Sequence, residues 1–476
     1  MAGIGFELNR LARKDDIMGI VHAFLHSAFA TAGPWIFTVV ALAAITYLYG
    51  GQMDNIELLN FRGIIVYNFS FSLVLSAPVF MVMTRYLADQ IHVKDVTPAP
   101  AVMIESMLLV YVLQLPVALF LYAFYLDLPL GLRLAGFANM FLIATVWLLG
   151  VFLTALKDYV AVTWAFLVGL TVGVLVSWLF SGDSQAVGML LGFNVGLAII
   201  VFWLAARVFA EYPYRLHATF ALKPYFRKYW EVAVAGFFYN AAIWVDKWVM
   251  WFAPEATVLS SNLRFYPDYD SAMFLAYLTL VPCFALFVFN VETQFFHHYR
   301  RFYTNILEHA SLKRIRYFHG QINKSITQGA RNLILCQGVV CALAVLLAPQ
   351  IFEKLNIYFM QLGMFRLGVL GAFFHGLLLF ATIILQYFDC RKSIMWVYGY
   401  FFASNLLFTL FVMLTYGFEF YGYGYFMAAA SSFVFGSFIL FRHIRMLPYH
   451  AFISNNNSVK VKTETDAQKR HSEVWV

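Results

Sequence analysis

The feature that most constrains this chain is a series of unbroken apolar stretches, many of them about 20 residues long. A helix of about 20 residues is long enough to cross the hydrocarbon core of a bilayer. Residues 141–156, FLIATVWLLGVFLTAL, are apolar on every side of a helix, whereas a membrane β-barrel strand alternates with a period of two. Apolar residues make up 62% of the sequence and charged residues 12%, too few to cover a water-soluble surface. The sequence therefore predicts an all-α polytopic membrane protein.

Charged residues and clusters of Gly, Pro and Asn separate the apolar stretches. They divide the chain into twelve predicted transmembrane helices, at residues 17–49, 61–87, 102–126, 135–156, 159–180, 187–206, 230–253, 271–296, 332–352, 364–388, 393–416 and 420–441. Proline removes a backbone hydrogen bond inside a helix, so we expect helix kinks at Gly33 with Pro34, at Pro78 and at Pro282.

The distribution of positive charge orients these helices. Most of the 32 Lys and Arg residues fall in segments on the same side as both termini, and such segments face the cytoplasm in helical membrane proteins. Both termini are therefore predicted to be cytoplasmic. Attraction to the anionic lipids of the inner leaflet explains the net charge of +7, so the charge does not indicate nucleic-acid binding.

The longest predicted cytoplasmic connections define the domain organisation. The predicted order is a cytoplasmic lead-in at 1–16, an N-terminal six-helix lobe at 17–206, an inter-lobe linker at 207–229, a C-terminal six-helix lobe at 230–441 with a cytoplasmic connection at 297–331, and a disordered basic tail at 442–476. The connection mixes aromatic and cationic residues. It predicts either an amphipathic helix lying on the membrane or a docking surface for a cytoplasmic partner.

Two adjacent charges, Asp246 and Lys247, interrupt the seventh predicted span. Adjacent helical residues point about 100° apart, so we expect each charge to have its own partner. Lys247 can extend toward the outer headgroups, whereas the shorter Asp246 needs a cavity, a donor or a cation. Asn240, beside Tyr239 and Trp244, completes a polar stripe flanked by aromatic rings, which suits sugar recognition. The alternative is that Asp246 and Lys247 each pair with another helix and fix the packing of the lobes.

Three further charged residues lie near the predicted cytoplasmic ends of spans. Glu292 is a candidate for the substrate pathway, and it can equally pair with the arginines that follow it. Arg85 and Asp89 are four residues apart, which predicts an ion pair at the end of the second span. The sequence contains no nucleotide-binding, dinucleotide-binding or catalytic motif and no cluster with metal-ligand spacing, so it predicts neither an enzyme nor a bound metal or cofactor.

Six segments carry a family resemblance from residue 1 to about residue 450: MAGIGFEL, GPWI, SAPVFMVMTRYLAD, FYNAAIWVDKWVMWF, YDSAMFLAYLTLVP and VETQFFHHYRRFY. In this order they resemble the PelG family, the inner-membrane transporters of the Pel exopolysaccharide system. The resemblance implies the multidrug/oligosaccharidyl-lipid/polysaccharide exporter fold, with two six-helix lobes around a central cavity. It also implies an N-acetylgalactosamine-rich cargo, a cytoplasmic glycosyltransferase partner and a membrane partner that binds cyclic-di-GMP.

The leading hypothesis is therefore a transporter that guides a polysaccharide from a cytoplasmic synthase to the periplasm. A hydroxyl-rich polymer needs a wet, polar path because unpaired hydroxyls are costly in hydrocarbon. Other hypotheses stay open. A cation-coupled transporter of small molecules or lipid-linked oligosaccharides would bind Na⁺ or H⁺ at Asp246. A membrane-embedded glycosyltransferase would need acidic residues in an outer loop, where Asp54 and Glu57 are the nearest candidates. A structural assembly platform would need no polar path.

Overall fold

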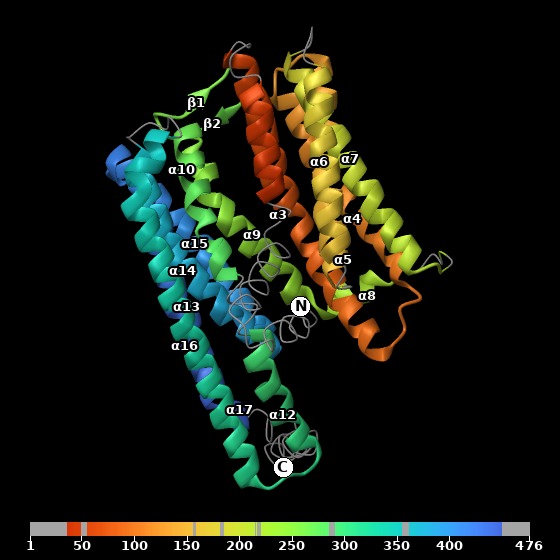
Figure 1. Ribbon diagram of the computed structural model, residues 1–476, viewed down its shortest axis with the longest axis vertical. Coiled ribbons are helices and arrows are strands. Elements are labelled where there is room, and N and C mark those ends of the chain that lie inside the picture. Colours follow the sequence, from red (N-terminus) through yellow and green to blue (C-terminus); the bar gives the residue numbers. More distant parts are fainter. Residues whose placement is uncertain are drawn as a thin grey trace, which may run out of the picture.

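The computed structural model describes residues 36–48, 55–155, 159–180, 185–214, 216, 220–284, 291–354 and 361–449. This part of the chain is nearly all helical, with one short two-stranded hairpin (Figure 1). Helices satisfy every backbone hydrogen bond internally, as apolar stretches of this length require in lipid. The predicted lead-in at 1–16, the kink at Gly33 and Pro34, and all of the predicted tail after residue 449 lie outside the described residues.

Five long helices form an N-terminal helix group, on one side of the molecule in Figure 1. They are α3 (Asn55–Val93), α4 (Ala99–Leu119) with its π-helical continuation η1 (Phe120–Tyr125), α5 (Leu130–Ala155), α6 (Tyr159–Leu179) and α7 (Gln185–Glu211). A shorter apolar helix, Ile36–Leu48, precedes them. α6 and α7 pack closely because Gly173 and Gly196 face each other: a Cβ added at Gly173 would lie 3.2 Å from the Cα of Gly196.

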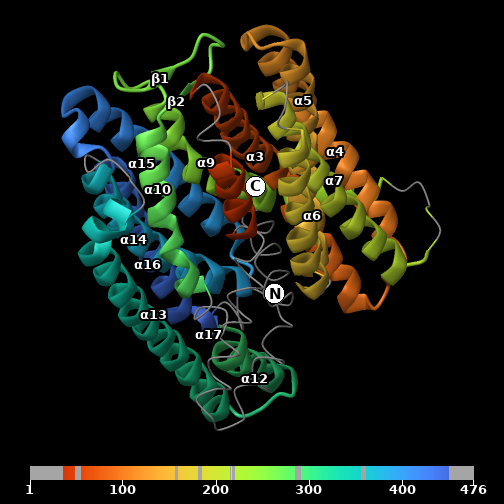
Figure 2. The same ribbon diagram turned by 45° about the horizontal axis from the view of Figure 1, so that its top comes forward.

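The remaining elements form a C-terminal helix group, which begins after the short helix α8 (Leu222–Lys228). They are α9 (Trp230–Met250), β1 (Thr257–Val258), β2 (Arg264–Phe265), α10 (Pro267–Leu278), η2 (Val291–Phe295), α12 (Phe296–Leu307), α13 (Leu312–Lys354), α14 (Leu362–Tyr387), α15 (Arg391–Thr415), η4 (Phe418–Phe420), α16 (Tyr423–Arg445) and α17 (Leu447–Tyr449). The two strands are antiparallel, and Thr257 pairs with Phe265. α9 packs against α15 within the group and against α3 of the other group (Figure 2).

Nine of the described helices are long and apolar enough to cross a membrane. They span Ile56–Val93, Ala99–Tyr125, Leu130–Thr154, Val160–Leu179, Ala186–Glu211, Leu312–Lys354, Leu362–Tyr387, Arg391–Thr415 and Phe418–Arg445. The other three predicted spans correspond to the short helix at 36–48, to α9 and to α10 with the residues that follow it. The total of twelve spans and the cytoplasmic position of both termini therefore stay predictions.

The prolines expected to cause kinks have different surroundings. Pro78 lies inside α3, which continues from Asn55 to Val93. α10 ends at Leu278, and helical residues resume at Leu280 and run past Pro282. A proline at 282 has no N–H for the carbonyl of residue 278, four positions earlier, which accounts for a break at this point.

The predicted connection at 297–331 is helical rather than irregular. It comprises α12 and the first half of α13, so α13 begins about twenty residues before the predicted span at 332–352. α12 and α13 form a hairpin, and their apolar side chains, including Phe302, Ile315 and Ile322, are buried in one cluster. The connection is therefore a pair of helices whose apolar side chains pack together, and its position on the membrane or against a cytoplasmic partner stays a prediction.

Candidate functional site

Asp246 and Lys247 pair with each other inside the C-terminal helix group. The Lys247 ammonium lies 3.0 Å from Oδ2 and 3.1 Å from Oδ1 of Asp246, and it donates to the carbonyl of Ile243 at 3.0 Å. It also lies 4.8 Å from the centre of the Tyr277 ring, a cation–π contact. Asp246 is 0% exposed and Lys247 is 6% exposed.

Two expectations about this pair were therefore wrong. Each charge was expected to have a separate partner, and Lys247 was expected to extend toward the outer headgroups. The flexible four-carbon stem of lysine overcomes the angle between the two Cβ positions and brings the ammonium back to the neighbouring carboxylate. The Tyr277 ring and the Ile243 carbonyl then satisfy the ammonium in the protein interior.

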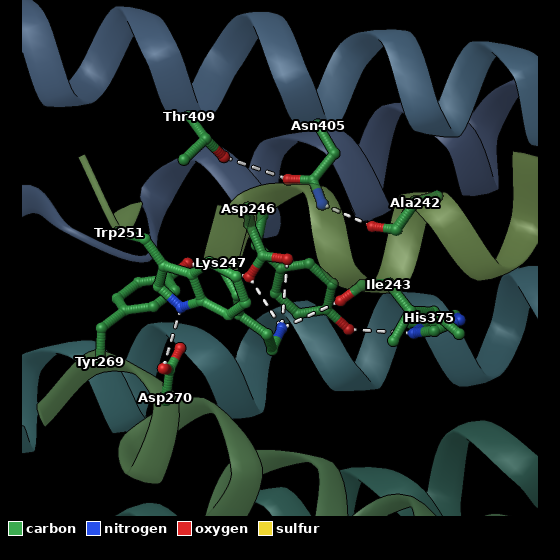
Figure 3. A network of polar contacts seen from close by, with 11 residues as sticks. Ala242, Ile243, Asp246, Lys247, Trp251, Tyr269, Asp270, His375, Asn405 and Thr409 are labelled. Carbon is green, nitrogen blue, oxygen red and sulfur yellow. Dashed lines mark hydrogen bonds and ion pairs between the residues drawn. The ribbon is translucent and has the colours of Figure 1, made fainter. Parts of the chain in front are cut away.

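Neighbouring helices complete the environment of this pair (Figure 3). The Tyr269 hydroxyl on α10 donates to Oδ2 of Asp246 at 3.0 Å. The next residue, Asp270, accepts a hydrogen bond from the indole N–H of Trp251 at 3.1 Å. On α15, the amide of Asn405 donates to the carbonyl of Ala242 at 2.8 Å. These contacts fasten α9 to both α10 and α15.

Several buried polar atoms around the pair make no hydrogen bond within the described part of the chain. They are Trp248 Nε1, Tyr266 OH, Asp270 Oδ1 and His375 Nε2. The other ring nitrogen of His375 lies 3.0 Å from the Tyr425 hydroxyl. Most buried polar atoms in native proteins have a partner, so this group marks a polar region whose hydrogen-bonding capacity the described residues do not fill.

Among the other residues predicted for the substrate pathway, Asn240 and Tyr239 make their described contacts away from Asp246. Asn240 is buried and donates to the carbonyl of Gly236 on its own helix at 2.8 Å. The Tyr239 ring packs against Tyr398, with ring centres 4.8 Å apart. Trp244 is half-buried on α9. Glu292 belongs to η2, and its side chain lies outside the described residues.

The two helix groups meet along an α3–α9 interface that contains two aromatic stacks. Tyr67 stacks on Trp251 with ring centres 4.5 Å apart and planes 5° apart. Phe71 stacks on Trp248 at 5.4 Å and 15°. Sequence reasoning predicted the span that contains Tyr67 and Phe71 but did not single out these two rings as functional candidates. Their only signal was the spacing of four residues, which places both rings on one face of a helix.

The segment between α9 and α10 fastens one end of this interface. The Tyr67 hydroxyl donates to the carbonyl of Arg264 at 2.7 Å, and the Ser261 hydroxyl donates to Asn60 at 2.7 Å. The backbone N–H of Asp127 also donates to the carbonyl of Ser261 at 3.1 Å. The β1–β2 hairpin of the C-terminal group is therefore attached to α3 and to the connection between η1 and α5.

A charged cluster around Tyr229, which we call the Tyr229 cluster, holds the opposite end of the α3–α9 interface together. Arg85 lies 3.6 Å from Asp89, as an i,i+4 pair on α3, and 3.9 Å from Asp389 between α14 and α15. The Tyr229 hydroxyl donates to Asp89 at 3.0 Å. Arg391 lies 3.2 Å from Asp389. The predicted Arg85–Asp89 pair is thus part of a network that joins the two helix groups.

Three cations also surround the aromatic ring of Tyr229. The guanidinium carbons of Arg85 and Arg391 lie 5.2 and 4.9 Å from the ring centre, and the ammonium of Lys228 lies at 4.9 Å. Contact with Tyr229 raises the pKa of Lys228, which therefore stays charged at physiological pH. Cations from both helix groups contact the same ring, so electrostatic interactions hold this end of the interface together, and salt can weaken them.

Solved structures show which fold this arrangement shares. The chain is similar to "Outward-facing conformation of a multidrug resistance MATE family transporter of the MOP superfamily", with a TM-score of 0.65, 13% identity, and coverage of 90% of this chain and 96% of the other. An inward-facing MATE family transporter is similar with a TM-score of 0.61 and 12% identity, over 84% of this chain and 94% of the other. A MOP superfamily transporter from Pyrococcus furiosus, described as having "reverse polarity of binding pocket", is similar with a TM-score of 0.59 and 13% identity, over 89% of this chain and 96% of the other.

These similarities show the fold alone. No curated protein matches the sequence. A family model does match, over residues 1–452, and its description is "PelG: Putative exopolysaccharide Exporter (EPS-E)". The match includes both helix groups, the α3–α9 interface and the clusters at its two ends. It confirms the resemblance found in the sequence, and together with the fold it identifies a multi-pass membrane transporter. The chain belongs to the PelG family of exopolysaccharide exporters.

Proposed function

We propose that this chain exports an exopolysaccharide from a cytoplasmic synthase to the periplasm across the bacterial inner membrane. The family match and the transporter fold support this function. The main supporting observation is the α3–α9 interface, where the two helix groups meet. Separate non-covalent contacts hold the two ends of this interface together. A path between the groups can open at one end while the other end stays fastened, as alternating access requires.

The proposed cargo is a Pel-like, N-acetylgalactosamine-rich polymer. A cytoplasmic glycosyltransferase supplies it, in a complex with a membrane protein that binds cyclic-di-GMP. The α12–α13 hairpin supports a cytoplasmic docking role, because it extends past the ends of α8 and α9 in Figure 1 and exposes many cations. The exposed cations are Arg300, Arg301, Lys313, Arg314, Arg316, Lys324 and Arg331.

The buried pair has a supporting role in this proposal. Asp246 and Lys247 hold α9 against α10, while Asn240 is satisfied within α9. Tyr239, Trp244 and Glu292 stay candidates for residues that the cargo meets. The cargo itself passes between the helix groups, where contacts can separate without exposing the buried charges of the C-terminal group.

Inverted inner-membrane vesicles test the proposal, since their cytoplasmic face is outward. Vesicles that contain this chain and its glycosyltransferase partner are supplied with UDP-N-acetylgalactosamine, and the polymer that resists added glycosidase is measured. We expect protected polymer in the lumen. Vesicles that lack this chain should make polymer that the glycosidase digests. Equal protection with and without the chain would contradict export.

A second candidate function, cation-coupled transport of small molecules or lipid-linked oligosaccharides, rests on the charge of the buried site. Lys247 contacts both oxygens of Asp246, whereas Asp270 accepts a hydrogen bond from the indole of Trp251 and has no ion pair in the described part of the chain. A coupling H⁺ or Na⁺ would therefore bind Asp270, whose Oδ1 makes no hydrogen bond in the described residues. Gradient-driven efflux that is lost in Asp270→Asn, with polymer secretion unchanged, would favour this function.

A further inference from the structure

The two aromatic stacks of the α3–α9 interface differ from most other ring contacts of the molecule because each joins the two helix groups. Tyr67 and Phe71 lie four residues apart on α3. Trp248 lies on α9, and Trp251, three residues later, is the C-cap residue that directly follows this helix. Both spacings bring two rings to one face of a helix, about 6 Å apart along the axis for four residues and about 4.5 Å for three. The stacks therefore form two consecutive steps along the interface.

The geometry of these stacks exposes flat ring faces when the helix groups separate. Within each stack the planes are nearly parallel, at 5° for Tyr67 with Trp251 and 15° for Phe71 with Trp248. Within α3, by contrast, Tyr67 and Phe71 meet edge to face at 66°. Each ring thus uses its face for the other helix group. Separation would leave four ring faces, arranged as two opposed pairs.

Polar atoms lie at the edges of the same rings. The indole N–H of Trp248 is buried and makes no hydrogen bond within the described residues. The indole N–H of Trp251 donates to Asp270, whose other oxygen, Oδ1, has no hydrogen-bond partner among the residues that the structure describes. Flat apolar faces with donors and acceptors at their edges match a pyranose ring, whose C–H face is apolar and whose rim carries hydroxyls.

We propose that Tyr67, Phe71, Trp248 and Trp251 form a sugar-stacking site that opens when α3 and α9 separate. Its ligand is a run of uncharged or N-acetylated pyranose units, and successive units replace the partner ring in each stack. This inference rests on the proposed export function and adds the residues that recognise the cargo. The closed stacks protect the site from lipid and solvent when no sugar is present.

Binding of an N-acetylgalactosamine oligosaccharide to the full chain in lipid nanodiscs tests the site. Saturation-transfer NMR reports which sugar protons contact aromatic rings, and a titration gives the affinity. We expect Phe71→Leu and Trp248→Leu each to weaken binding by about tenfold. Trp248→Phe keeps a ring and should restore most of the affinity. The matched control is Phe238→Leu, which removes a stack of α9 with Phe402 inside the C-terminal group and should leave binding unchanged.

A cross-link that avoids the rings provides a second test. A Cβ added at Gly236 on α9 would lie 2.7 Å from Met81 on α3, so Met81→Cys with Gly236→Cys places two thiols across the interface. We expect the oxidised protein to bind the oligosaccharide more weakly than the reduced protein, because the cross-link limits how far α3 and α9 can separate at the stacks. Unchanged binding after oxidation, or in both leucine variants, would overturn the proposal. Such results would leave the export function intact if the vesicle lumen still accumulates polymer.

Discussion

Arg85 on α3 and Asp389 between α14 and α15 lie 3.9 Å apart, so one ion pair connects the N-terminal and C-terminal helix groups at the Tyr229 end of their interface. Both side chains are more than one third exposed, at 39% and 44%. An ion pair with this exposure is weak enough to break during transport. Arg85 and Arg391 also contact the Tyr229 ring, which keeps the charged groups close enough for the pair to form again.

The coupling between these residues is measurable. In a double-mutant cycle of Arg85→Ala and Asp389→Ala, followed by thermal unfolding in detergent, we expect a coupling energy of up to about 1 kcal/mol that falls as salt rises. Arg133 with Asp127, an ion pair inside the N-terminal helix group, is the matched control for salt dependence. Additive single changes at low salt would contradict a direct pair.

The ring of Tyr229 should matter more than its hydroxyl. Tyr229→Phe loses one hydrogen bond, to Asp89, but keeps the ring that Arg85, Lys228 and Arg391 share. We expect it to keep most export activity and to lower stability by about 1 kcal/mol. Tyr229→Ala removes both and should increase the labelling of a cysteine placed at position 85 or 389. Similar labelling in the alanine and phenylalanine variants would show that the ring does not fasten the interface.

Breaking the buried pair should be costly. Lys247→Met leaves the Asp246 carboxylate buried without its cation, and we expect destabilisation of about 3–5 kcal/mol, seen as a lower unfolding temperature in detergent. Adding Asp246→Leu removes the unpaired charge and should recover much of this loss. If the double variant is as unstable as Lys247→Met, the cost comes from packing rather than charge.

Arginine should not replace Lys247. A lysine that reaches the outer headgroups would tolerate this change, but the buried ammonium sits between Asp246, the Ile243 carbonyl and the Tyr277 ring. The larger planar guanidinium does not fit the same contacts. We expect Lys247→Arg to reduce accumulation of the protein in membranes, measured by immunoblot against wild type. Normal accumulation and export would contradict this environment.

The close contact between Gly236 and Met81 predicts that a substitution at Met81 can suppress the effect of a larger residue at position 236. A methyl group at this position would lie 2.7 Å from Met81 Cγ and 3.3 Å from the Ala77 carbonyl. Gly236→Ala should therefore push α9 away from α3 and destabilise the protein by about 1–3 kcal/mol. Met81→Ala makes room, so the double variant should be more stable than Gly236→Ala alone, as thermal unfolding would show. Gly150, which has open space around its Cβ position, provides the control substitution.

The long apolar stretches were sufficient to predict the helices, because length and apolarity alone decide whether a segment can cross a bilayer. The same reasoning placed the start of one span at residue 332, whereas α13 starts at Leu312. Polar residues in that first half are compatible with a helix, since α12 covers its apolar face. Hydropathy measures solubility in lipid and therefore cannot find the polar part of a helix.

The candidate site was harder to predict because its contacts join residues far apart in sequence. Asp246 and Lys247 were identified as unusual, but their pairing depends on the lysine rotamer and on Tyr269 and Tyr277. Tyr67 gave no signal above that of many other aromatic residues in this sequence. Only its position opposite Trp251, which lies 184 residues later in the sequence, gives it a candidate role.

α13 has a mechanical consequence. It is one continuous helix of 43 residues, about 65 Å long, and its first half carries the hairpin with α12. A rod of this kind tilts as a unit, so a load on the hairpin tip would move the opposite rim of the C-terminal group. A synthase that pulls on the tip during each addition of sugar would thereby drive the transporter in step with polymer growth.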